Sequence, residues 1–155
     1  MSISKYVDAV INENDWEITN LSNVSACINE KLSDVSWVGF YLTRDLENSE
    51  KELVLGPFQG KVACTHIAYG RGVCGDSAKM DKTIIVADVS GYKGYIACDS
   101  EARSEIVIPL HDHEGNVIGV LDIDSNTEGR FTQPDDESAD LEECARIIER
   151  ILSGY

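Results

Sequence analysis

The segment EIVIPLHDHEGNVIGVLDID, residues 105–124, predicts a β-hairpin and with it the fold class. Two runs rich in β-branched residues, 105–111 and 116–124, flank the stretch DHEG, whose Asp and Gly are typical of a tight turn. Two strands joined by so short a turn pair antiparallel. We therefore expect an antiparallel sheet that extends outward from this pair.

Acidic residues stand where this hairpin should be apolar. In the run LDID, strand alternation turns Leu121 and Ile123 to one face and Asp122 and Asp124 to the other. Aspartate is a poor strand former, so two in alternation need a reason. Because hairpin pairing brings Glu105 to the same end, three acids are expected to converge on one face of the sheet.

Three interpretations of this acidic cluster remain open on the residue pattern. The cluster fits an ordinary solvated strand end. It also fits a catalytic site, since like charges held close together raise the pKa of at least one carboxyl and keep it protonated as a proton donor. A cation held by carboxylate oxygens is the third interpretation.

A second strand is predicted at residues 36–43, SWVGFYLT. Alternation puts Val38, Phe40 and Leu42 on a core face and Trp37, Gly39 and Tyr41 on the other. The two aromatic side chains either pack under a helix or wall a slot over the glycine. Such a slot would suit a small apolar group such as a methyl.

The remaining pattern predicts helices at both ends of the chain and further strands between them. The first helical region is expected to break near residues 12–15, with Asn14 or Asp15 as a cap and Trp16 on its apolar face. Gly-Pro at 56–57 is expected to end one strand. The expected helices are 2–32, 70–81 and 134–152, and the other strands are 52–55, 64–69 and 83–89. This order indicates an α+β fold in a single domain, residues 1–155.

Three of the five cysteines, Cys64, Cys74 and Cys98, lie among small residues between positions 56 and 99. We expect them to carry the chemistry, whereas Cys27 and Cys144 fall within helices and are expected to be buried. A zinc site from these three thiols and His66 is an alternative, but the paired CxxC spacing of zinc sites is absent.

The charge balance, 13 basic against 28 acidic residues and a formal charge of −15, disfavours nucleic acid and anionic membranes as partners. No secretory leader or membrane span is evident, so a cytoplasmic location is expected. The loop GRGVCG lacks the spacing of nucleotide-binding loops.

The segments SWVGFYL, GPFQGKVAC, GRGVCG, IACDS, SEIVIPL and GVLDIDS, in this order, resemble the free methionine-(R)-sulfoxide reductases. These are single GAF-domain enzymes, and the likeness covers about residues 36–125. It implies a GAF-like central antiparallel sheet of about six strands with the N- and C-terminal helices on one side. It also implies reduction of free L-methionine-(R)-S-oxide to L-methionine.

Carried over by motif, the resemblance implies a role for each candidate residue. Cys98 resembles the nucleophile and Cys64 its resolving partner, while Cys74 resembles a third cysteine that is also a candidate nucleophile. The aromatics resemble those around the substrate's methyl end, and the acids resemble those at its polar groups: Trp37, Tyr41, Glu105, Asp122 and Asp124. Residues 92–96, YKGYI, depart from the family, which has a proline-containing turn and a histidine at position 95.

Thiol chemistry then requires attack on the sulfoxide sulfur, a sulfenic acid, and an intramolecular disulfide. An acid, Glu105 or Asp124, would protonate the departing oxygen. We expect no metal and no bound cofactor, with the thioredoxin/NADPH system as external reductant. A homodimer formed through the terminal helices is compatible with the sequence.

Two alternatives without turnover remain, a GAF module that binds a small molecule and a thiol redox sensor. A pure redox sensor has no need of the aromatic pair or of three converging acids. The sequence therefore favours the enzyme.

Overall fold

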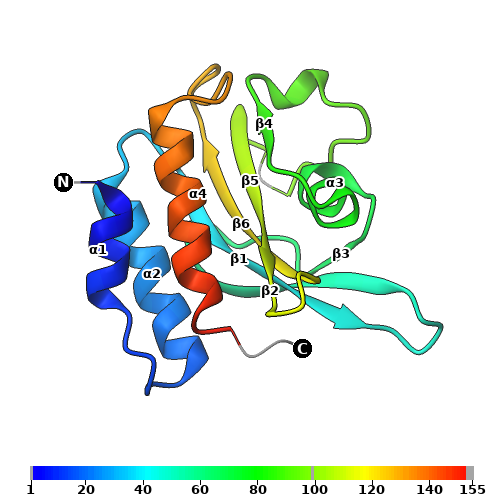
Figure 1. Ribbon diagram of the computed structural model, residues 1–155. Helices are drawn as coiled ribbons and strands as arrows, with labels where there is room; N and C mark the ends of the chain where they lie inside the picture. Colours follow the sequence, from blue (N-terminus) through cyan, green and yellow to red (C-terminus); the bar gives the residue numbers. More distant parts are fainter. Residues whose placement is uncertain (1, 99, 153–155) are drawn as a thin grey trace.

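A six-stranded antiparallel sheet forms the centre of the computed structural model, which describes residues 2–98 and 100–152 (Figure 1). The strand order is β3-β2-β1-β6-β5-β4, and every neighbouring pair is antiparallel. The strands are β1 (Trp37–Asp45), β2 (Lys51–Gln59), β3 (His66–Ala68), β4 (Ile84–Val86), β5 (Ser104–His111) and β6 (Val117–Ser125). The predicted α+β class and antiparallel sheet are confirmed.

The helices divide between the two faces of the sheet (Figure 1). On one side lie α1 (Ile3–Val10), α2 (Glu17–Lys31) and α4 (Asp136–Glu149), whereas α3 (Gly72–Met80) lies on the other. A short 3-10 turn, η1 (Val89–Gly91), follows β4. The N- and C-terminal helices thus share one side of the sheet, as expected. No helix in the described part of the chain has both the length and the apolar composition needed to cross a bilayer.

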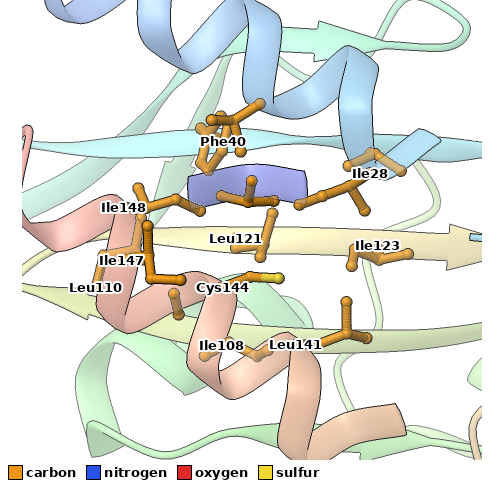
Figure 2. Packing of buried hydrophobic residues seen from close by; sticks show 14 of the residues in the cluster. Ile28, Phe40, Ile108, Leu110, Leu121, Ile123, Leu141, Cys144, Ile147 and Ile148 are labelled. Atoms are coloured by element: carbon orange, nitrogen blue, oxygen red, sulfur yellow. The ribbon is translucent and has the colours of Figure 1, made fainter. Parts of the chain in front are cut away.

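The core between the sheet and α1, α2 and α4 is built from the alternating apolar residues of the central strands. Figure 2 shows Phe40, Leu121 and Ile108 from three strands in one cluster with Ile28 of α2 and Ile148 of α4, all fully buried. Burying each such side chain contributes about 1.5–3 kcal/mol. Cys27 and Cys144 belong to this layer as small buried residues, as predicted.

The β5–β6 hairpin has the predicted register. Glu105 lies opposite Asp124 and Val107 opposite Asp122. Ile106, Ile108 and Leu110 face the helices, so the acids face the other side of the sheet. The convergence expected from the sequence is therefore present, and it falls on the face that α3 covers in part.

Strand β2 is longer than predicted, because it continues through Gly56 and Pro57 to Gln59. The pairing with β1 shifts register between Gly39 and Tyr41, and neither Gly56 nor Pro57 has a paired partner there. A proline lacks the N–H that a ladder needs, but at a bulge no ladder bond is lost. The predicted break is thus a bulge.

The ends of four helices and strands also differ from the expectations. Strand β3 covers only three residues and leaves Cys64 outside it, and β4 likewise is shorter than residues 83–89. Asp135 caps α4 in a capping box with Ser138, so the helix begins after Pro134. Trp16 is the N-cap of α2, with no side-chain cap, and is 71% exposed instead of lying on the apolar face.

Candidate active site

A pocket that is open to solvent lies on the face of the sheet opposite α1, α2 and α4. Strands β1, β5 and β6 form its floor, and α3 with the segments around residues 62 and 96 forms its rim. All predicted site residues except Cys64 line it: Trp37, Tyr41, Cys74, Cys98, Glu105, Asp122 and Asp124. Cys64 is joined to Cys98 by a disulfide, so the fold brings the whole predicted set together.

The three thiol positions differ in their surroundings. Cys64 and Cys98, 34 residues apart in sequence, are bonded at a Cα–Cα distance of 5.3 Å, and both are half-buried. Cys74 is a free, buried thiol in the first turn of α3, and its Sγ donates to Glu105 Oε1 at 3.8 Å. His66 is largely exposed and pairs with Glu52, so the four-residue zinc set considered above does not assemble.

The polar atoms of the two aromatic side chains hold the segment that carries Cys64. The Trp37 indole Nε1 donates to the Lys61 carbonyl at 3.0 Å, and the Tyr41 hydroxyl donates to the Cys64 carbonyl at 2.9 Å. Each neutral bond of this kind contributes about 0.5–1.5 kcal/mol. Both rings therefore fix the position of one half of the disulfide as well as lining the pocket.

The space over Gly39 is not an open slot. The Trp37 ring lies there itself, stacked between Tyr41 at 5.9 Å and Phe58 at 5.2 Å between centroids. A Cβ added to Gly39 would lie 2.4 Å from Phe58 Cβ and 2.7 Å from the Trp37 ring. The sequence interpretation of a ligand slot above this glycine is wrong, and the glycine serves to let the indole lie flat on the sheet.

The Gly39→Ala variant is therefore expected to be folded but less stable. Overpacking of this size costs about 1–3 kcal/mol, and here it also displaces the indole that lines the pocket. Urea unfolding followed by circular dichroism measures the loss. Gly115→Ala is not a suitable control because Gly115 has φ +85°, whereas Gly91→Ala meets nothing within 4 Å and should leave both stability and indole fluorescence unchanged. Equal stability of Gly39→Ala and wild type would contradict this packing.

The acidic residues are buried, which changes their protonation. Glu105 and Asp122 are each only 5% exposed. Burial, and then the charge of Asp124, raise the pKa of Glu105 to about 8. Burial and the neighbouring Glu105 also raise the pKa of Asp122 well above its usual value. At neutral pH Glu105 is thus a protonated carboxyl in contact with a pocket, which can act as a proton donor.

The same neighbours keep the thiol of Cys74 protonated. Desolvation is the largest cause of its raised pKa, followed by the charges of Asp122 and Glu105. A thiolate is the nucleophilic form of cysteine. Cys74 in this environment is therefore a weak nucleophile, while Cys98 lies nearer to solvent.

The buried acid predicts how stability depends on pH. The folded-state pKa of Glu105, about 8, lies above the unfolded value of 4.5, so its protonation stabilises the fold fully below about pH 4.5. This contribution is lost as the pH rises through about 8, and Asp122 acts in the same direction. Urea unfolding at pH 5 and pH 8 should show a larger fall in stability for wild type than for Glu105→Gln. An equal fall in both proteins would contradict a raised pKa.

Several residues in or beside the pocket were not predicted from the sequence. Phe58 extends the aromatic stack, and Tyr95 and Ile96 cover the rim on the Cys98 side. Arg71, the N-cap residue of α3, is exposed at the mouth, and the first turn of α3 faces the pocket without a side-chain cap. The glycine-rich run GRGVCG was the available signal for a helix start at this place.

The segment that departs from the expected family pattern has its own support. The Tyr92 hydroxyl donates to Asp76 Oδ2 of α3 at 2.6 Å. A backbone bond from Tyr95 N–H to the Tyr92 carbonyl, 3.1 Å, closes the turn that follows. This loop is thereby tied to the helix that carries Cys74, without the proline and histidine that the resemblance implies.

Comparison with known proteins gives consistent matches. The model of the GAF domain matches residues 24–153. Free methionine-R-sulfoxide reductase of Escherichia coli is 44% identical over 136 residues, 88% of this chain and 78% of the relative. The solved structure of free methionine-R-sulfoxide reductase from Neisseria meningitidis in complex with its substrate has a TM-score of 0.85 at 40% identity, covering 96% and 86% of the two chains. The reduced form of fRMsr of Staphylococcus aureus has a TM-score of 0.86 at 42% identity, covering 97% and 93%.

Proposed function

Because the chain belongs to the GAF-domain family of free methionine-R-sulfoxide reductases, we propose that it reduces free L-methionine-(R)-S-oxide to L-methionine. One observation supports this reaction above the others. A single pocket combines a cysteine pair, a buried carboxyl that is protonated at neutral pH, and a wall of aromatic rings. These are a reductant, a proton donor and a surface for an S-methyl group.

The first step is attack by the thiolate of Cys98 on the sulfoxide sulfur. Glu105 gives its proton to the sulfoxide oxygen as the new sulfur–sulfur bond forms. The oxygen then moves to the Cys98 sulfur: a Cys98 S–O bond forms while the methionine S–O bond and the sulfur–sulfur bond break, which leaves Cys98 as a sulfenic acid. Methionine leaves with the two electrons that the cysteine sulfur has lost. The exposure of Cys98 and the raised pKa of Cys74 favour Cys98 as the attacking thiol.

The second step joins Cys64 to the oxidised Cys98. The Cys64 sulfur attacks the sulfenic sulfur, the oxygen leaves as water, and a disulfide forms. The Cys64–Cys98 bond in the structure is the product that this step requires. An external dithiol then restores both thiols by exchange, and we assign this role to thioredoxin, which NADPH keeps reduced in the cytoplasm. No bound cofactor takes part in these steps.

The charges of the pocket support a free amino acid as the substrate. Asp124, less buried than Glu105 and Asp122, suits the substrate ammonium. Arg71 and the uncapped N–H groups of α3 suit the substrate carboxylate. Within a peptide both groups are amides and carry no charge, so a methionine sulfoxide residue in a protein loses both interactions.

The proposal is tested by supplying purified protein with a dithiol and measuring methionine released from free and peptide-bound methionine sulfoxide. Turnover of the free R epimer supports the reaction, and absence of turnover rejects it.

A further inference from the structure

The lining of the pocket includes three metal-ligating atoms in one group. One ligand atom each from Cys74, Glu105 and Asp122 lies within 4.8 Å of the others, and all three residues are buried. The thiol comes from α3 and the carboxyls from the adjacent strands β5 and β6, so three separate elements fix their positions. Cys74 has no part in the reaction steps proposed above, which leaves its placement unexplained.

A second observation indicates a missing ligand at this point. The buried Oδ1 atom of Asp122 has no hydrogen-bond partner among the described residues, although only 5% of Asp122 is exposed to solvent. Within residues 2–98 and 100–152, no Lys, Arg or His forms an ion pair with Glu105 or Asp122. A buried acceptor without a partner costs about 1–3 kcal/mol, so a cation that it could bind would be favoured here.

The distance between the Cys74 and Glu105 ligand atoms fits a tetrahedral transition-metal ion. Zn–S and Zn–O bond lengths place adjacent sulfur and oxygen ligands ~3.6 Å apart, and Cys74 Sγ lies 3.8 Å from Glu105 Oε1. One thiolate with two carboxylates suits Zn²⁺ better than Mg²⁺ or Ca²⁺, which prefer oxygen ligands alone. Three protein ligands also leave a fourth position open toward the pocket.

We propose that Cys74, Glu105 and Asp122 form an inhibitory Zn²⁺ site at the base of the pocket. On binding, the ion displaces the thiol proton of Cys74 and the acid proton of Glu105 to solvent, and no electrons are transferred. Glu105 then has no proton to donate, and the ion occupies the space beside the reacting oxygen. Zinc and methionine sulfoxide therefore exclude one another. The binding stands without the proposed reaction, whereas the inhibition rests on it.

Cobalt provides a direct probe of the ligand set, because Co²⁺ bound to a thiolate gives a charge-transfer band in the ultraviolet. The experiment uses untagged protein with the Cys64–Cys98 disulfide intact, so that neither of these sulfurs can bind the metal. Co²⁺ is expected to bind with the thiolate band, and added Zn²⁺ is expected to displace it. Surface binding to histidine lacks this band and would overturn the proposal if it were the only signal.

Variants identify the ligands. Cys74→Ser should remove the thiolate band and weaken Zn²⁺ binding by about 100-fold or more, and Asp122→Asn should weaken it by at least about 10-fold. Cys27→Ser is the matched control, since Cys27 is a buried free thiol in α2 away from the pocket, and it should bind like wild type. Circular dichroism checks that each variant is folded. An unchanged affinity in Cys74→Ser, or a band that disappears in Cys27→Ser, would reject the site.

Steady-state assays then test the inhibition separately. Zn²⁺ should raise KM for methionine sulfoxide without lowering kcat, and excess substrate should release bound Co²⁺. If Co²⁺ binds through Cys74 but the protein reduces no sulfoxide, the proposed function fails and the metal site remains. If the protein is active and binds no metal at the pocket, the metal site alone fails.

Discussion

Cys98→Ser protein is expected to release no methionine in a single turnover, whereas Cys64→Ser protein should release close to one equivalent and then stop. Without the Cys98 sulfur nothing attacks the sulfoxide, so the first step should slow by at least about a thousand-fold. In the structure Cys98 is bonded to Cys64. Without Cys64, the sulfenic acid on Cys98 forms but has no neighbouring thiol with which to form this disulfide. Rapid quenching with quantification of methionine measures both results.

The Cys74→Ser variant distinguishes between the two candidate nucleophiles, Cys98 and Cys74. Cys74→Ser should keep the first step, because burial and nearby acids raise the pKa of Cys74 and disfavour its thiolate. Cys27→Ser serves as the control for loss of a free thiol elsewhere and should behave like wild type. If Cys74→Ser alone lost the first step while Cys98→Ser retained it, the assignment of Cys98 would be wrong.

Glu105→Gln should lower kcat/KM by roughly 10²–10⁴-fold, the range that one general acid contributes. The amide preserves the size of the side chain and removes the transferable proton. For wild type, the rate of the chemical step should fall as the pH rises through about 8, where Glu105 loses its proton. In Glu105→Gln this fall should disappear, because the group that titrates is gone. Single-turnover rates from pH 6 to pH 9 measure both effects.

Glu128→Gln is the matched control, since Glu128 is exposed, pairs with Arg103 and lies outside the pocket lining. It should leave both the rate and the pH profile unchanged. Asp124→Asn adds a second variant at the register partner of Glu105 and should raise KM more than it lowers kcat, because Asp124 is assigned to the ammonium. Wild-type rates in both Glu105→Gln and Asp124→Asn would show that these acids form a buried structural cluster without a role in catalysis.

The sequence was sufficient for the central sheet because its signals are local. A tight turn between two alternating strands fixes the pairing, so the opposition of Glu105 and Asp124 could be predicted from residue spacing alone. The same alternation correctly assigned Phe40 to the helix side and Trp37 to the pocket side.

Where the sequence failed, tertiary contacts decided. Pro57 would end a strand in a regular ladder, but a bulge opposite β1 tolerates it. The space over Gly39 is filled by the Trp37 ring and Phe58, and no spacing rule predicts how a ring turns. Trp16 fits the helical period, yet it precedes the first helical residue and stays exposed.

In the candidate site too, some features could be predicted from the sequence and others depend on tertiary contacts. Motif resemblance pointed to Cys64 and Cys98, which the structure joins, and to the three acids that line the pocket. It did not reveal that Cys74 Sγ lies against Glu105, because that contact joins α3 to β5 across 31 residues of sequence. The burial that raises both pKa values is a property of the folded pocket and not of any motif.

The central claim is that this pocket reduces free methionine sulfoxide, and the most direct measurement compares three substrates with one dithiol reductant. These are the free R epimer, the free S epimer, and an R sulfoxide blocked as an amide at both ends. We expect a kcat/KM for the free R epimer that exceeds each of the others by roughly 100-fold or more, because only it presents the correct sulfur configuration and both charges. Preference for the blocked substrate, or no methionine from any of the three, would show that the pocket does not have this function.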